Sequence, residues 1–223
     1  MVNCEILNHS IIAHRGIYNN ITIYENTIES IMYAVKNNLI VEIDVRLTLD
    51  NEVIVYHDDI ADRFLKLKDK VNTLTYEELL YLSPFHIPTL KEVLDNINLE
   101  IPIIIEVKED NKIIRNKLNE LLKKYKGKFV IQSFIYDALK YYKKMGYFVG
   151  LLVSDRLNRD IVSKYPDVDF VNIKYNSIDK VEANKLKEKY YLVGYTINNR
   201  EEFNYNIKTF NNLVVDNIEE VFR

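Results

Sequence analysis

The sequence has little cysteine, no long apolar run and no excess of basic charge. Its single cysteine, Cys4, has no second cysteine in the chain to pair with. The first residues also lack the charged start and long apolar core of a secretion signal, so we expect a reducing, cytoplasmic environment. The sequence contains no run of about 18 apolar residues, which a membrane-spanning helix would need. A formal net charge of −3, with no Lys/Arg cluster among stacking aromatic residues, argues against a nucleic-acid partner.

The composition is that of a globular protein. Of the 223 residues, 48% are hydrophobic and 28% are charged, which is enough apolar material for one sizeable core. No linker or internal repeat interrupts the chain. We therefore expect a single domain spanning residues 1–223.

Apolar and acidic residues alternate strictly from Val41 to Val45, which predicts a strand with Glu42 and Asp44 on the same face. Apolar residues flank this stretch on both sides, so we expect both faces to be buried. Buried paired carboxylates repel each other and lose hydration, so they need a cation or strong hydrogen-bond donors nearby. Taken alone, however, such a pair is more often solvated or ion-paired than metal-binding.

A hairpin is predicted directly after this strand. The pair Asp50-Asn51 is a turn signal between two strand-like arms. If the arms fold symmetrically about these two residues, Asp44 lies opposite His57. An imidazole would then stand beside the acidic pair.

The rest of the chain alternates between strand-like and helical stretches. Eight strands are expected to begin near residues 11, 40, 101, 129, 148, 170, 191 and 213. Helical stretches are expected between them, including one that begins at Asn26 or Thr27 and one from Lys112 to Tyr125 with Ile113, Ile114, Leu118, Leu121 and Leu122 facing inward. This α/β pattern predicts a (β/α)8 TIM barrel with a β-hairpin excursion and a small cap, at about residues 58–88, after the second strand. A nine-stranded open doubly wound sheet is the alternative.

Chemically active side chains stand where the predicted strands end. The first strand ends in His14-Arg15, and the third ends in Glu106 with Lys108 two residues later. Together with Glu42 and Asp44 this makes three carboxylates, a set that suits a hard divalent cation with oxygen ligands. The two histidines suit acid-base chemistry, and the two basic side chains suit a phosphate.

Several motifs, in this order, resemble the glycerophosphodiester phosphodiesterase family. They are H-R-G at 14–16, E-N-T at 25–27, E-x-D-V at 42–45, H-D at 57–58, I-P-T-L at 87–90, I-E-x-K at 105–108, Q-S-F at 132–134, Y-T-I-N at 195–198 and V-D at 215–216. The resemblance implies a TIM barrel with one Mg²⁺ or Ca²⁺ and paired histidines. It also implies hydrolysis of glycerophosphodiesters to sn-glycerol 3-phosphate and an alcohol, a reaction of glycerol and lipid metabolism.

Carried over by motif, the resemblance assigns a role to each of these residues. Glu42, Asp44 and Glu106 would bind the metal, His14 would be the general base and His57 the general acid. Arg15 and Lys108 would hold the phosphate, although Lys108 could simply be the ion-pair partner of Glu106. A substrate pocket could include Gln132, Ser133, Phe134 and Tyr195, whereas Glu25 and Asn26 are expected to be structural.

The chain departs from the family pattern in several places. Phe64 follows Arg63 where the family has a threonine, Tyr195 replaces a tryptophan and Val215 replaces a threonine. The segment between His57 and Pro88 is short for the family, so we expect a small cap over the site.

Three other functions remain open from the sequence. The first is a phosphodiester lyase of the same barrel type that stops at a cyclic phosphate. The second is a non-catalytic phosphodiester-binding module, and the third is an unrelated barrel enzyme that acts on sugar phosphates.

Overall fold

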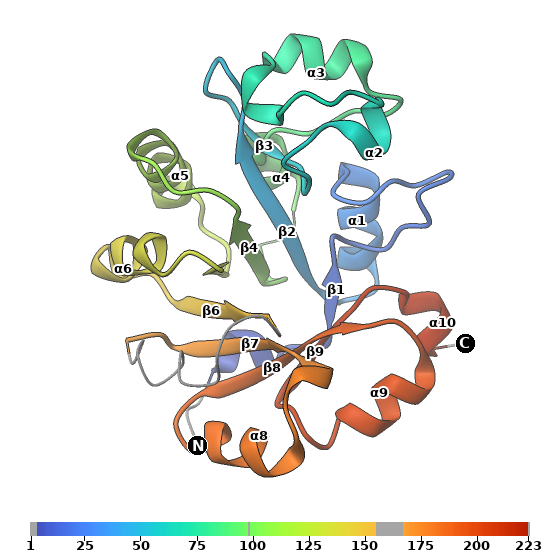
Figure 1. The fold of residues 1–223 in the computed structure, drawn as a ribbon, viewed down its shortest axis with the longest axis vertical. Coiled ribbons are helices and arrows are strands. Elements are labelled where there is room, and N and C mark those ends of the chain that lie inside the picture. Colours follow the sequence, from blue (N-terminus) through green and yellow to red (C-terminus); the bar gives the residue numbers. More distant parts are fainter. Residues whose placement is uncertain (1–3, 98, 155–166, 223) are drawn as a thin grey trace.

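Eight parallel strands close into a barrel in the computed structural model, which describes residues 4–97, 99–154 and 167–222 (Figure 1). The strands are β1 (Ile12–His14), β2 (Ile40–Leu47), β4 (Ile103–Val107), β5 (Phe129–Ser133), β6 (Val149–Val153), β7 (Phe170–Lys174), β8 (Tyr191–Ile197) and β9 (Asn212–Val215). Each strand pairs with its neighbour, and β1 pairs with both β9 and β2, which closes the ring. The predicted TIM barrel is therefore confirmed, and the open sheet is excluded.

The hairpin after β2 is also present. Strand β3 (Val53–Val55) pairs antiparallel with the end of β2 and lies outside the ring of parallel strands. The predicted register was wrong by one residue, because Asp44 lies opposite Tyr56, whose backbone N–H donates to the Asp44 carbonyl at 3.0 Å. The turn is centred on Asp50 alone, and Asn51 completes it in the left-handed conformation with φ 65°. His57 therefore does not pair with Asp44. It is the first residue after Tyr56, which does.

The barrel interior changes from apolar to polar along the strands. Near the strand starts, inward side chains such as Ile12, Ile104 and Phe170 form one apolar cluster with Leu7 of the short 3₁₀ helix η1 (Glu5–Asn8). Gly150 leaves room for the Phe170 ring, since an added Cβ would lie 2.1 Å from it. Toward the strand ends the inward positions carry charged and amide groups, so the polar site lies at the carboxyl end of the barrel.

The outward side chains of the strands pack against the helices. These are α1 (Ile28–Lys36), α4 (Leu90–Asn96), α5 (Lys112–Lys124), α6 (Tyr136–Lys144), α8 (Lys180–Lys187), α9 (Arg200–Asn206) and α10 (Ile218–Phe222), with the 3₁₀ helix η3 (Tyr175–Ser177) before α8. Helix α1 begins after Thr27, which forms a capping box with Ser30. The inward assignment of Ile113 was wrong, because it is 46% exposed while Ile114 is buried. The helical stretch expected between β6 and β7 falls mostly outside the described residues.

The cap after the hairpin folds around a small apolar cluster of its own. It contains α2 (Asp62–Leu65), the 3₁₀ helix η2 (Val71–Thr73) and α3 (Tyr76–Leu82), and it stands over β3 in Figure 1. Leu65, Val71 and Leu79 pack there against Ile54 of β3. Within the described parts of the chain, no helix combines the length and the apolar character needed to cross a bilayer.

Candidate active site

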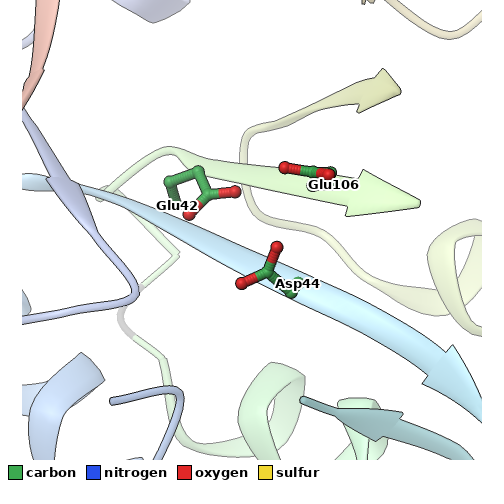
Figure 2. Close-up of side chains that lie close together, drawn as sticks. All are labelled: Glu42, Asp44 and Glu106. Carbon is green, nitrogen blue, oxygen red and sulfur yellow. The ribbon is translucent and has the colours of Figure 1, made fainter. Parts of the chain in front are cut away.

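Three buried carboxylates meet at the carboxyl end of two neighbouring strands. Glu42 and Asp44 come from β2 and Glu106 from β4, and the strand register places Asp44 beside Glu106. Figure 2 shows the three carboxylates turned toward a common space. One oxygen of each lies within 4.8 Å of one oxygen of the others, and the residues are at most 6% exposed. This triad could hold a metal ion.

Two basic side chains neutralise part of the charge of the triad. Lys108 Nζ lies 2.6 Å from Glu106 Oε1 and 3.2 Å from Asp44 Oδ1, and Arg15 Nε lies 3.2 Å from Asp44 Oδ2. Burial alone would raise the pKa of Asp44, but Lys108 and Arg15 hold it below its ordinary value. Burial and then the charge of Asp44 raise the pKa of Glu42 and of Glu106. The positive charges of Lys108 and Arg15 are therefore too few to neutralise all three carboxylates.

A hard divalent cation fits this set of donors. The three side chains offer only oxygen ligands, and the buried Asp44 Oδ1 accepts no well-aligned hydrogen bond, although Lys108 Nζ lies 3.2 Å away. A divalent cation would supply the missing positive charge and would satisfy that oxygen.

His14 stands beside the triad at the end of β1. Its Nδ1 lies 2.9 Å from Asp216 Oδ1, and its Nε2 lies 3.9 Å from Glu42 Oε2. Burial alone would raise the pKa of Asp216, but the hydrogen bonds with His14 and from the Tyr18 hydroxyl hold it below its ordinary value. An ionised Asp216 accepts the Nδ1 proton of His14, so Nε2 is directed toward the site.

His57 has a similar carboxylate partner. Its Nδ1 lies 2.7 Å from Asp58 Oδ1, and the second oxygen of Asp58 accepts from Arg63 Nε at 2.8 Å. The site thus contains two imidazoles, each with a carboxylate on Nδ1.

The sequence matches a known family over most of its length. A model of the glycerophosphoryl diester phosphodiesterase family matches residues 14–218. The chain belongs to this family. It is accordingly an enzyme of the glycerophosphodiester phosphodiesterase class, and it shares its TIM barrel with solved structures of this family.

Individual relatives are similar over nearly the whole chain. The protein YhdW of Bacillus subtilis (strain 168) is 28% identical over 213 residues, which cover 86% of this chain and 87% of YhdW. A crystal structure of a glycerophosphodiester phosphodiesterase from Thermotoga maritima has a TM-score of 0.78 at 27% identity, with 95% and 96% of the two chains covered. A phosphodiesterase from Oleispira antarctica, in complex with the product sn-glycerol-3-phosphate, shares the fold with a TM-score of 0.81 at 22% identity, over 95% and 94% of the two chains.

The other residues predicted for the candidate site lie in different surroundings. Gln132 donates to Glu42 Oε1 at 3.2 Å, so it contacts the triad directly. The Ser133 hydroxyl donates to the Val107 carbonyl at 2.7 Å within the barrel wall. The rings of Phe134 and Tyr195 meet edge to face with centroids 6.4 Å apart, and Phe134 is 42% exposed.

Two residues for which the sequence predicts a structural role, Asn26 and Glu25, contact members of the candidate site. Asn26 does not cap α1; its Nδ2 donates to Asp44 Oδ2 at 2.9 Å, and its backbone is left-handed with φ 58°. Glu25 is 4% exposed and accepts from Arg15 Nη1 at 2.7 Å. The E-N-T motif was a local signal for both residues, although it did not reveal their partners.

Proposed function

We propose that this enzyme hydrolyses glycerophosphodiesters to sn-glycerol 3-phosphate and an alcohol, with one divalent cation and two catalytic histidines. The observation that carries the proposal is the buried triad of Glu42, Asp44 and Glu106, flanked by two carboxylate-paired imidazoles and two cationic side chains. No simpler structural role requires all of these groups at one end of a barrel.

The triad would hold the cation, and oxygen ligands of this kind suit Mg²⁺ or Ca²⁺. When bound, the cation would supply Lewis-acid stabilisation of the charge on the phosphoryl oxygens. Gln132 and Asn26 support this arrangement, because they donate hydrogen bonds to Glu42 and Asp44 and so fix the two carboxylates.

Arg15 and Lys108 would bind the phosphate of the substrate. Both lie within 3.2 Å of Asp44, and the buried Arg15 Nε donates no hydrogen bond within the protein. Fixed positive charge at this position stabilises the extra negative charge of the transition state more than that of the ground state.

The two histidines would move the protons. His14 would accept a proton at Nε2 from the attacking hydroxyl, because its Nδ1 is held by Asp216. The attacking oxygen in this scheme is the glycerol hydroxyl next to the phosphate. His57 would donate a proton to the leaving alcohol oxygen as its bond to phosphorus breaks. Water then attacks the phosphorus of the cyclic phosphate and breaks its bond to the neighbouring glycerol oxygen, which gives glycerol 3-phosphate. In this step His57 would take a proton from the water and His14 would return its proton to the released glycerol oxygen.

The metal requirement is tested by hydrolysis of glycerophosphocholine and glycerophosphoethanolamine with and without a chelator. We expect EDTA to abolish turnover and Mg²⁺ or Ca²⁺ to restore it. The Glu42→Gln variant should need a higher cation concentration for half-maximal activity, because it lacks one anionic ligand. Glu29→Gln is the matched control, since it removes the same charge from the exposed side of α1. Full activity in excess EDTA would contradict the proposal.

A further inference from the structure

The cap contacts the active site through a forked ion pair made by Arg63 of α2. Its Nε donates to Asp58 Oδ2 at 2.8 Å, while its Nη1 and Nη2 donate to the two oxygens of Glu25 at 2.6 and 2.5 Å. The guanidinium group therefore bridges two carboxylates with three hydrogen bonds. A planar fork of five N–H donors can do this, whereas an ammonium group cannot match both carboxylates at once.

Each of these two carboxylates also holds a group of the proposed catalytic machinery. Asp58 Oδ1 is the partner of His57 Nδ1 at 2.7 Å. Glu25 Oε1 accepts from Arg15 Nη1 at 2.7 Å, and Arg15 in turn lies beside Asp44. An unbroken chain of contacts thus runs from His57 through Asp58, Arg63, Glu25 and Arg15 to Asp44 of the triad, and Arg63 joins its two halves.

We propose that Arg63 is a positioning residue that orients His57 and Arg15 together, by bridging Asp58 and Glu25. It links the proton donor for the leaving group to the group that binds the phosphate. The inference rests on the proposed function, because it assigns to His57 and Arg15 the roles given there. It concerns a residue outside the metal-binding triad and the histidine pair.

The charge balance around Glu25 supports this role. Burial would raise the pKa of Glu25, but the hydrogen bonds from Arg63 and then the charge of Arg15 lower it. Without Arg63, Glu25 would be a buried carboxylate with Arg15 as its remaining cationic partner. The Arg15 side chain would then be drawn toward Glu25 and away from a bound phosphate.

Contacts other than the ion pair hold the cap in place, so the role of Arg63 can be tested by mutation. Phe64, the next residue of α2, packs edge to face on Tyr24 and Phe85 with centroids 5.6 and 5.1 Å apart. Tyr24 and Phe85 are themselves stacked at 4.3 Å. The Arg63 guanidinium also lies 4.3 Å from the centroid of the Phe64 ring, but the contacts of Phe64 with Tyr24 and Phe85 join α2 to the loop before α1 without the ion pair.

The experiment compares Arg63→Ala and Arg63→Lys with the wild-type enzyme on glycerophosphocholine. We expect Arg63→Ala to lower kcat by about 10- to 100-fold, the usual effect of losing a group that orients a catalytic side chain, and to raise KM because Arg15 is misplaced. Arg63→Lys should recover part of the loss, since lysine restores the charge but reaches one carboxylate at a time.

Arg115→Lys is the matched control. Arg115 makes a two-pronged ion pair with Asp110 at 2.6 Å and lies over the Tyr141 ring at 5.1 Å, much as Arg63 does with its own partners. It contacts none of the groups assigned to catalysis here. We expect its kcat and KM to equal those of the wild type.

Two readouts separate positioning from a purely structural effect. If Arg63 acts on kcat through His57, the kcat loss should nearly disappear on a p-nitrophenyl diester, whose leaving group needs no proton. It should likewise disappear when Arg63→Ala is combined with His57→Ala, because the group being oriented is absent. Wild-type kinetics in Arg63→Ala, or an equal kcat loss in the presence and absence of His57, would overturn the inference.

The failure of this inference can be told apart from the failure of the proposed function. A wild-type enzyme that turns over no glycerophosphodiester with either cation would refute the function. Hydrogen exchange then tests the bridge alone: Arg63→Ala should accelerate exchange in both residues 19–27 and residues 58–65, and Arg115→Lys should not. Unchanged exchange in either segment would overturn the bridge.

Discussion

At the scale of single residues, the site is defined by how each charge is balanced. Asp44 is flanked by Lys108 and Arg15, so it stays ionised despite complete burial. Glu42 and Glu106 have raised pKa values because burial and the charge of Asp44 both disfavour a second and a third negative charge. A bound cation would reverse this preference. Without one, the pair holds protons more readily than an ordinary glutamate does.

The histidine pair gives the most specific prediction at this scale. We expect His14→Ala and His57→Ala each to lower kcat by about 10²- to 10⁴-fold, the usual range for general acid-base catalysis. Stability should change little, because neither side chain belongs to the buried core of the barrel. If His57 is the acid, its variant should regain activity on a p-nitrophenyl diester, while the His14 variant should not.

His86→Ala serves as the control for these two variants. His86 is half exposed and pairs with Glu92 in the first turn of α4, so its loss should leave kcat unchanged. Equal losses on good and poor leaving groups would remove the assignment of His57 as the acid.

At the scale of secondary structure, the sequence correctly predicts the features that depend only on residues close together in the chain, such as strands and helix caps. The alternation in Val41–Val45 correctly indicates a strand, and two Thr-x-x-Glu patterns, at Thr75 and Thr89, form capping boxes in the structure. A hairpin register depends on the turn conformation, which a two-residue turn signal does not specify. This is why Asp44 was placed opposite His57 rather than Tyr56.

Contacts between distant segments lay beyond such local patterns. Asp216 is 202 positions from His14, and Arg63 is 38 positions from Glu25. The strand-end position of Asp216 was visible in the sequence, but its pairing with the His14 ring depends on ring closure between β1 and β9. The contact of Asn26 with Asp44 was obscured because asparagine before a helix is also an ordinary cap.

The hairpin turn itself can be tested by mutation of Asn51. Its φ of 65° is tolerated by asparagine and glycine but strains other L-residues. We expect Asn51→Ala to cost about 1 kcal/mol in the free energy of unfolding. Asn51→Gly should remain close to the wild type, because glycine adopts this conformation freely. Urea unfolding measures both variants, and equal stability of the alanine and glycine variants would contradict this account.

At the scale of the whole molecule, the barrel separates stability from chemistry. Its apolar base is closed by Leu7 and Cys4 near the chain start, and the polar site lies at the other end of the strands. Substitutions at the base are therefore expected to change stability more than catalysis.

The base of the barrel also predicts how stability depends on alkaline pH. Burial raises the pKa of the Cys4 thiol from 9.0 to about 11. The pKa of the thiol is higher in the folded state than in the unfolded state, so the folded protein favours the neutral thiol. The contribution of this thiol to the free energy of unfolding is therefore fully present below about pH 9 and is lost as pH rises toward 11. We expect the urea midpoint of the wild type to fall more steeply between pH 8 and 10.5 than that of Cys4→Ala. Parallel declines would contradict this account, because they would mean that the thiol has the same pKa in the folded and unfolded states.

The central claim is that the barrel cleaves the bond between phosphorus and the alcohol oxygen and finishes with a hydrolysed monoester. Phosphorus-31 NMR of glycerophosphocholine turned over in ¹⁸O-labelled water with Mg²⁺ or Ca²⁺ tests it most directly. We predict sn-glycerol 3-phosphate as the final phosphorus species, with one ¹⁸O bound to phosphorus, and free choline. A cyclic phosphate that persists as the end product, phosphocholine with free glycerol, or no turnover with either cation would contradict the account.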